Sequence, residues 1–101
     1  MIRILQGNML TCRLTQSAWA DILLTLENWG WHPPHLRTSY LASNAIIDAT
    51  DAGGMAEAGN RLMQALLADP LTCYVNLKVD MGKLAEIVAL CEDGGFTVGN
   101  E

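Results

Sequence analysis

Two histidines and their neighbours are the part of this sequence best suited to chemistry. His32 and His35 form an H-x2-H pair inside the stretch WGWHPPHLR, residues 29 to 37. Imidazole is a common zinc ligand, but zinc takes about four ligands, three of them from protein even in catalytic sites. The other candidate ligands are distant in sequence: Cys12, Cys73, Cys91, Asp48 and Asp51. We therefore expect surface histidines and no metal or other cofactor.

Thiol and carboxylate chemistry has equally little support. The cysteines are three in number, form no CxxC pair and fall on predicted apolar faces. This pattern argues against a disulfide framework and a zinc ribbon, and a nucleophilic cysteine needs a polar setting with a nearby imidazole. Asp48 and Asp51 could form an acid–base pair. No substrate motif accompanies them, so we expect no catalytic residue.

Part of the histidine segment has the composition of a recognition surface. After helix termination has accounted for Trp29, Gly30 and Pro33, five residues of this region remain unexplained. They are Trp31, His32, His35, Arg37 and Tyr40. Aromatic residues and arginine are enriched at protein interfaces, so these five are the predicted partner-binding residues. Alternatively, Trp31 and Tyr40 fold back over the edge of the core, because a small domain needs large apolar side chains.

Length and charge limit the possible partners. A chain of 101 residues, half of them hydrophobic, predicts a single domain over residues 1–101 with an ample core. The net charge is −5, and the six basic residues are spread along the chain. Nucleic-acid binding requires clustered Lys and Arg, so no nucleic acid is expected. An acidic surface instead favours a basic protein partner and mainly raises the association rate.

The sequence also predicts no membrane association. It has no run of about 18 apolar residues, the minimum that suggests a transmembrane helix. Near the start, Gln6, Gly7 and Asn8 interrupt the apolar residues that a signal peptide would need. We expect a cytoplasmic protein.

The first fourteen residues predict a β-hairpin, with the turn signal Gly7-Asn8 between two extended runs. A two-residue loop would mix apolar and polar faces across the strands. A three-residue loop over 6–8 would place Ile4 opposite Leu10 and Ile2 opposite Cys12. We therefore expect the three-residue loop, with Asn8 in the left-handed conformation.

Apolar spacing predicts three amphipathic helices, over residues 16–29, 51–68 and 81–93. Thr15 is the expected N-cap of the first, Thr50 or Asp51 of the second and Asp80 of the third. The second helix has a face of small residues, formed by Ala52, Ala56, Gly59 and Met63. This face would allow close approach by another element of the chain, or by a second copy in a homodimer.

Short strands complete the predicted fold. They are expected around Ala45 to Asp48, over 72–79, where apolar and polar residues alternate, and as an edge strand over 96–98. A helix is the competing interpretation of 72–79. The predicted fold class is α+β, with three amphipathic helices packed on a small antiparallel sheet formed by the N-terminal hairpin and short strands.

Three segments of the chain resemble a family of small bacterial proteins that has no assigned function. They are AWADILLTL leading into GWHP, then IDATDAGGMAEAGNRLMQALL, then IVALCEDGGFTV. In that order they cover about half of the chain. The resemblance implies a shared fold and a bacterial or phage origin, and it carries over no catalytic residue. Gly59 departs from the pattern, since a better helix former is expected there.

These observations favour a small non-catalytic protein-binding domain, of the inhibitor, immunity-protein, adaptor or phage-encoded antagonist type. A small-molecule or metal-dependent enzyme that uses the His32 and His35 loop is the alternative.

Overall fold

Four antiparallel strands and a group of helices form an α+β fold, as the sequence predicts. The computed structural model describes residues 1–7, 9–41, 45–69 and 81–100, so the predictions for 72–79, Cys73, Asn8 and Asp80 lie outside the described residues. The strands are β1 (Ile2–Gln6), β2 (Met9–Leu14), β3 (Ala45–Ile47) and β4 (Phe96–Asn100), in the order β2-β1-β4-β3. The helices are α1 (Gln16–Asn28), α2 (Arg37–Leu41), α3 (Ala49–Ala68) and α5 (Met81–Asp93).

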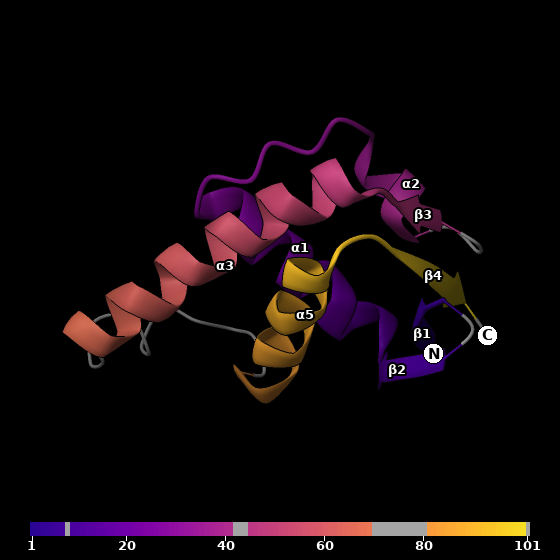
Figure 1. Cartoon of the computed structure of the whole chain (residues 1–101), viewed down its shortest axis with the longest axis horizontal. Coiled ribbons are helices and arrows are strands. Elements are labelled where there is room, and N and C mark those ends of the chain that lie inside the picture. Colours follow the sequence, from indigo (N-terminus) through magenta and orange to yellow (C-terminus); the bar gives the residue numbers. More distant parts are fainter. Residues whose placement is uncertain (8, 42–44, 70–80, 101) are drawn as a thin grey trace.

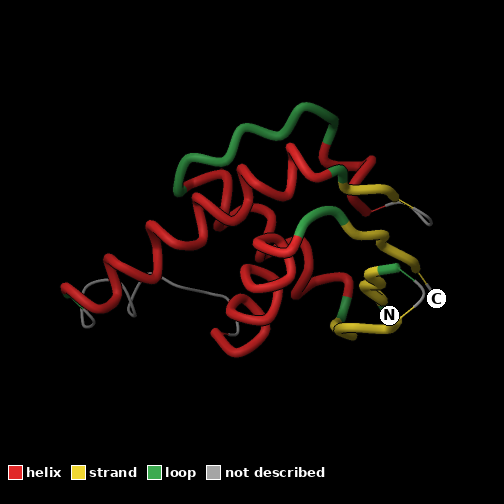
Figure 2. The backbone as a smooth tube through the Cα atoms, in the orientation of Figure 1, coloured by secondary structure: helices red, strands yellow, loops and turns green. Residues whose placement is uncertain are grey.

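The sheet lies at one end of the molecule, and the helices occupy the rest (Figure 1). The long helix α3 runs beside α5, and the two ends of the chain lie near each other at the sheet (Figures 1 and 2). The core contains apolar side chains from both the sheet and the helices. No helix among the described residues is long and apolar enough to cross a membrane.

The β1–β2 hairpin differs from the predicted one. Its strands end at Gln6 and begin again at Met9, so the three-residue loop is wrong. Ile4 pairs with Cys12 and Leu5 with Leu10, which leaves an extra residue in β2 between these pairs, a β-bulge. The bulge compensates for the shorter loop, because an inserted residue restores the facing of the apolar side chains beyond it. Gly7, at φ 64°, takes the left-handed conformation in the turn.

Helix α1 forms as its sequence predicts. The Thr15 hydroxyl oxygen accepts a hydrogen bond from the Ala18 backbone N–H at 3.0 Å, which confirms the N-cap. The apolar stripe from Trp19 to Leu26 is buried. Gly30, at φ 110°, then redirects the chain into the histidine segment. The exit of α1 therefore positions residues 30–36 beside α3.

Helix α3 begins two residues earlier than predicted, and its N-cap is Asp48. Asp48 Oδ1 accepts a hydrogen bond from the Asp51 backbone N–H at 2.8 Å. The prediction of Thr50 or Asp51 as the cap is wrong because β3 ends at Ile47 and the helix follows at once. Asp48 is then the residue with extended backbone whose side chain can reach the free N–H groups of the first turn. This frees the Asp51 side chain for another role.

The face of small residues on α3 is buried within the chain. Ala52 is fully buried, Ala56 nearly so and Met63 partly. A Cβ atom at Gly59 would overlap the Val88 side chain of α5. The element that packs closely against this face is therefore α5 of the same chain. A homodimer through this face would have to displace α5.

The C-terminal part of the chain closes the sheet. Helix α5 spans the predicted residues, and Gly94 ends it at φ 129°. Strand β4 pairs with β1 on one side and β3 on the other, so the prediction of an edge strand is wrong. Tight packing accompanies this position: a Cβ at Gly95 would collide with the Ile47 carbonyl oxygen. The one-turn helix α2 lies between α1 and β3 and was not among the three helices that the sequence predicts.

Candidate functional site

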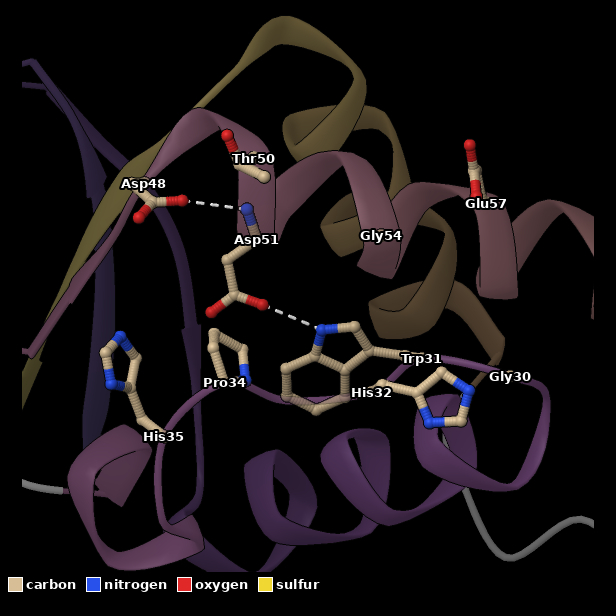
Figure 3. A pocket seen from close by; sticks show the side chains of 10 residues that line it. All are labelled: Gly30, Trp31, His32, Pro34, His35, Asp48, Thr50, Asp51, Gly54 and Glu57. Carbon is tan, nitrogen blue, oxygen red and sulfur yellow. Dashed lines mark hydrogen bonds between the residues drawn. The ribbon is translucent and has the colours of Figure 1, made fainter.

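A pocket of about 610 Å³ lies between residues 30–35 and the first turns of α3 (Figure 3). One wall is the segment that follows α1, and the other is the N-terminal half of α3, which begins where β3 ends. The lining residues are Gly30, Trp31, His32, Pro34, His35, Asp48, Thr50, Asp51, Gly54 and Glu57.

The Asp51 carboxylate holds the two walls together. Trp31 Nε1–H donates a hydrogen bond to Asp51 Oδ1 at 2.8 Å, and the Tyr40 hydroxyl donates one to Oδ2 at 2.7 Å. All three side chains are buried, with exposed fractions of 3% for Trp31, 2% for Tyr40 and 6% for Asp51. Trp19 Nε1–H donates to the Tyr40 backbone carbonyl at 2.9 Å. Both ends of the segment from Trp31 to Tyr40 are thus fastened to helices.

The local sequence of α3 explains this arrangement. Asp51 is in the first turn of the helix, where the free N–H groups and the helix dipole favour a carboxylate. Gly54 follows within one turn, and a Cβ there would lie 3.2 Å from Trp31 Cδ1. Glycine at this position lets the indole ring lie close against the helix. Trp31 and Tyr40 also pack edge to face, with ring centroids 5.2 Å apart.

The exit from α1 is fixed by a further contact. Arg61 of α3 donates a hydrogen bond from Nη1 to the Trp29 carbonyl oxygen at 3.0 Å. Its Nη2 lies 3.9 Å from Glu57 Oε2, as the i,i+4 spacing of these residues allows. Both side chains are largely exposed, so this ion pair contributes little to stability.

Negative charge predominates in the pocket. Asp48, Asp51 and Glu57 contribute carboxylates, and the described lining contains neither Lys nor Arg, although Arg61 lies 3.9 Å from Glu57. The hydroxyl of Tyr40 stays protonated, because its pKa is raised above the ordinary value for tyrosine. The larger cause is burial, and the second is the hydrogen bond to Asp51. Tyr40 is therefore a permanent hydrogen-bond donor to Asp51 at physiological pH.

The structure separates the five predicted partner-binding residues into groups. His32 and His35 are exposed and line the pocket. The Trp31 and Tyr40 side chains are buried at the edge of the core, which is the alternative arrangement expected from sequence. Arg37 begins α2. The exposed part of the pocket lining therefore includes the two histidines, Asp48 and Glu57, whereas Asp51 and the two aromatic rings are buried.

Sequence reasoning missed the central position of Asp51. It treated Asp48 and Asp51 as a helix cap or an acid–base pair, whereas one caps α3 and the other accepts bonds from two aromatic side chains. The sequence does contain a signal: Asp48 and Asp51 are three residues apart, and only one of them can be the N-cap of the helix. The other therefore needs a different partner. Gly54 and Glu57 were also not identified as lining residues.

The described part of the chain contains no cluster of metal-binding side chains, and its thiols are buried. No group of three or more His, Cys, Asp or Glu side chains is arranged to hold a metal ion there. Cys12 and Cys91 are buried free thiols. Burial raises the pKa of Cys12 to about 11, helped by its hydrogen bond to Glu86, and burial raises that of Cys91 to about 12. Both thiols are protonated and poorly nucleophilic at neutral pH.

Comparisons with protein-family models, with curated proteins and with solved structures find no match to this chain.

Proposed function

We propose that this chain is a small non-catalytic protein-binding domain that contacts a basic protein partner at the mouth of the pocket. The single observation that supports this most strongly is the pocket itself, with three lining carboxylates and no Lys or Arg in its described lining. The negative charge of the whole chain, −5, adds a long-range attraction to the same kind of partner.

The two candidate acid–base carboxylates have structural roles that fit binding better than proton transfer. Asp48 caps α3, and Asp51 joins Trp31 and Tyr40 to the helix. A general acid or base has to exchange its proton with a substrate in each catalytic cycle. Loss of the Asp51 acceptor would instead leave two buried donors without a partner.

His32 and His35 are the side chains with which to test the proposal. Because both are exposed, their replacement is expected to change the free energy of unfolding by no more than about 0.5 kcal/mol. Trp31 would be a poor choice, since truncation of a buried tryptophan destabilises the core by about 3–5 kcal/mol.

The experiment compares three tagged proteins: the native chain, a His32→Ala/His35→Ala variant, and a Gln16→Ala/Gln64→Ala control with two exposed changes outside the pocket lining. Each is used to recover partners from cells that naturally express the chain, and the recovered proteins are quantified by mass spectrometry. We expect a basic protein that the native chain and the control recover, and that the histidine variant loses by at least about tenfold, equivalent to about 1.4 kcal/mol. Equal recovery by the folded histidine variant would contradict the proposal.

A further inference from the structure

We infer that the pocket receives an arginine side chain of an extended segment of the partner, with an apolar residue of that segment lying beside it at the edge of β3. The inference rests on the proposed function and adds the chemistry of the bound group.

The first argument comes from the charge on Asp51. This side chain is more than nine-tenths buried, and its two hydrogen-bond donors, Trp31 and Tyr40, are neutral. In the described part of the chain Asp51 has no Lys or Arg partner. A carboxylate offers about four acceptor positions, and two are used here. A buried charge without an opposite charge is costly, and a cation in the pocket would offset that cost.

The second argument concerns the shape and chemistry of the walls. The indole of Trp31 and the ring of Pro34 line the pocket together with the carboxylates. In Figure 3 the Asp51 carboxylate points toward these two rings. A guanidinium group is planar, weakly hydrated and able to contact a ring and a carboxylate together. A lysine ammonium group is more strongly hydrated and makes no such planar contact. These walls therefore favour arginine over lysine.

The third argument is a second cavity next to the first. It has a volume of about 230 Å³, and His35 lines both cavities. The other lining residues are Ser39, Tyr40, Ala45, Ile46 and Ile47. Three of these belong to β3, which pairs only with β4 within the described sheet and exposes Ile46 by 75%. The acidic cavity thus adjoins, at a strand edge, a smaller cavity whose lining combines the polar groups of His35, Ser39 and Tyr40 with the apolar side chains of β3.

Two adjoining cavities with the exposed Ile46 at the strand edge favour a peptide segment as the occupant, because a free cation would use only the acidic cavity. In an extended peptide, residues i and i+2 point to the same side, about 6.6 Å apart. A segment with arginine at one position and an apolar residue two positions away matches the order of the cavities. An exposed strand edge is also a common place for such segments to bind.

The test uses synthetic peptides and the full chain. Ac-Gly-Arg-Gly-Leu-Gly-amide is compared with peptides in which the arginine is replaced by citrulline, a neutral analogue of nearly the same shape, or by lysine. Binding is followed by two-dimensional ¹H–¹⁵N NMR on the indole N–H signals of the tryptophans. The Trp31 signal reports on the first cavity, because its indole N–H is bonded to Asp51, and the Trp19 signal reports on the second, because its indole N–H is bonded to the carbonyl oxygen of Tyr40.

We expect the arginine peptide to shift the Trp31 signal and to bind at least about tenfold more tightly than the citrulline peptide, because citrulline lacks the charge that pairs with the carboxylates. The lysine peptide should bind more weakly than the arginine peptide. Asp48→Asn should weaken arginine binding while the asparagine still caps α3. Asp69→Asn, about 27 Å from Asp51 along α3 at about 1.5 Å per residue, removes the same charge and should have no effect.

Other results would overturn the inference. Equal binding of the arginine and citrulline peptides would show that charge is not recognised, and equal binding of the lysine peptide would remove the preference for guanidinium. If no arginine peptide binds while the histidine variant still loses its partner, this inference fails and the proposed function stands. If the histidine variant keeps its partner, the proposed function itself fails.

Discussion

The hydrogen bond from Tyr40 to Asp51 allows the most closely controlled test of how the pocket is built. Tyr40→Phe removes one oxygen atom and leaves the ring in place against Trp31. In that variant the Asp51 oxygen that accepts the 2.7 Å hydrogen bond from Tyr40 would lose its donor, and it is too buried for water to replace that donor well. Hydrogen bonds to charged groups contribute about 1.5–3 kcal/mol, so we expect the free energy of unfolding to fall by about 2 kcal/mol.

The measurement is urea unfolding followed by circular dichroism, with thermal unfolding as a second observable. For a domain of about 100 residues, a loss of about 2 kcal/mol corresponds to a decrease in Tm of roughly 8–16 °C. The denaturant dependence of the unfolding free energy should stay the same, because the surface exposed on unfolding is unchanged.

A double-mutant cycle with Asp51→Asn isolates the pair. The asparagine side chain of that variant would keep an acceptor for Trp31 and present an amide N–H toward Tyr40, so each single change removes the charged bond without a large cavity. We expect a coupling free energy of about 1 kcal/mol or more. A Tyr40→Phe variant whose stability lies within about 0.5 kcal/mol of the native chain would refute the reasoning, since ordinary surface substitutions have effects of that size.

The remaining predictions concern α3 and the buried thiols. Gly59→Ala should destabilise the chain by about 1–2 kcal/mol, because overlap of the new methyl group with α5 outweighs the gain in helix propensity. Gly53→Ala, with nothing within 4 Å of its Cβ, should stabilise the chain by up to about 1 kcal/mol. If urea unfolding showed that both substitutions change stability in the same direction, the packing of α3 on α5 would be contradicted. Asp48→Ala should lower the free energy of unfolding by about 1 kcal/mol, whereas Asp48→Asn should leave it almost unchanged. Equal decreases in Tm for the two variants would show that Asp48 is not the cap. Folded-state pKa values of about 11 for Cys12 and about 12 for Cys91 exceed the ordinary value of 9.0, so the unfolded chain loses these protons first. The contribution of the two thiols to stability should therefore be constant through neutral pH and fall as the pH rises above about 9. Cys91→Ala should reduce that slope in a series of urea titrations, whereas an unchanged slope would contradict the assignment.

Local patterns in the sequence predict most of the helices. The spacing of Trp19, Ile22 and Leu26 identifies α1, and Thr15 marks its start, because both signals depend on residues within a few positions of each other. The same is true of α5 and of most of α3. The α+β class follows from these helices together with the alternation in the first hairpin.

Features that depend on distant contacts were not predictable in this way. The bulge in β2 compensates for a shorter loop, and β4 lies inside the sheet because β1 and β3 both pair with it. The role of Asp51 depends on Trp31 and Tyr40, which approach it only when the segment after α1 folds back over α3. The same folding back buries the side chains of Trp31 and Tyr40, which the composition of this segment had suggested as contact residues.

The central claim, that a protein partner binds at the mouth of this pocket, is tested most directly by photo-crosslinking. A photoreactive amino acid replaces His32 in one protein and Gln64, which is also exposed but lies outside the pocket lining, in another. We predict that irradiation of cells that naturally express the chain links one basic protein to position 32 and not to position 64. Crosslinks to the same proteins from both positions, or to none from position 32, would contradict the claim.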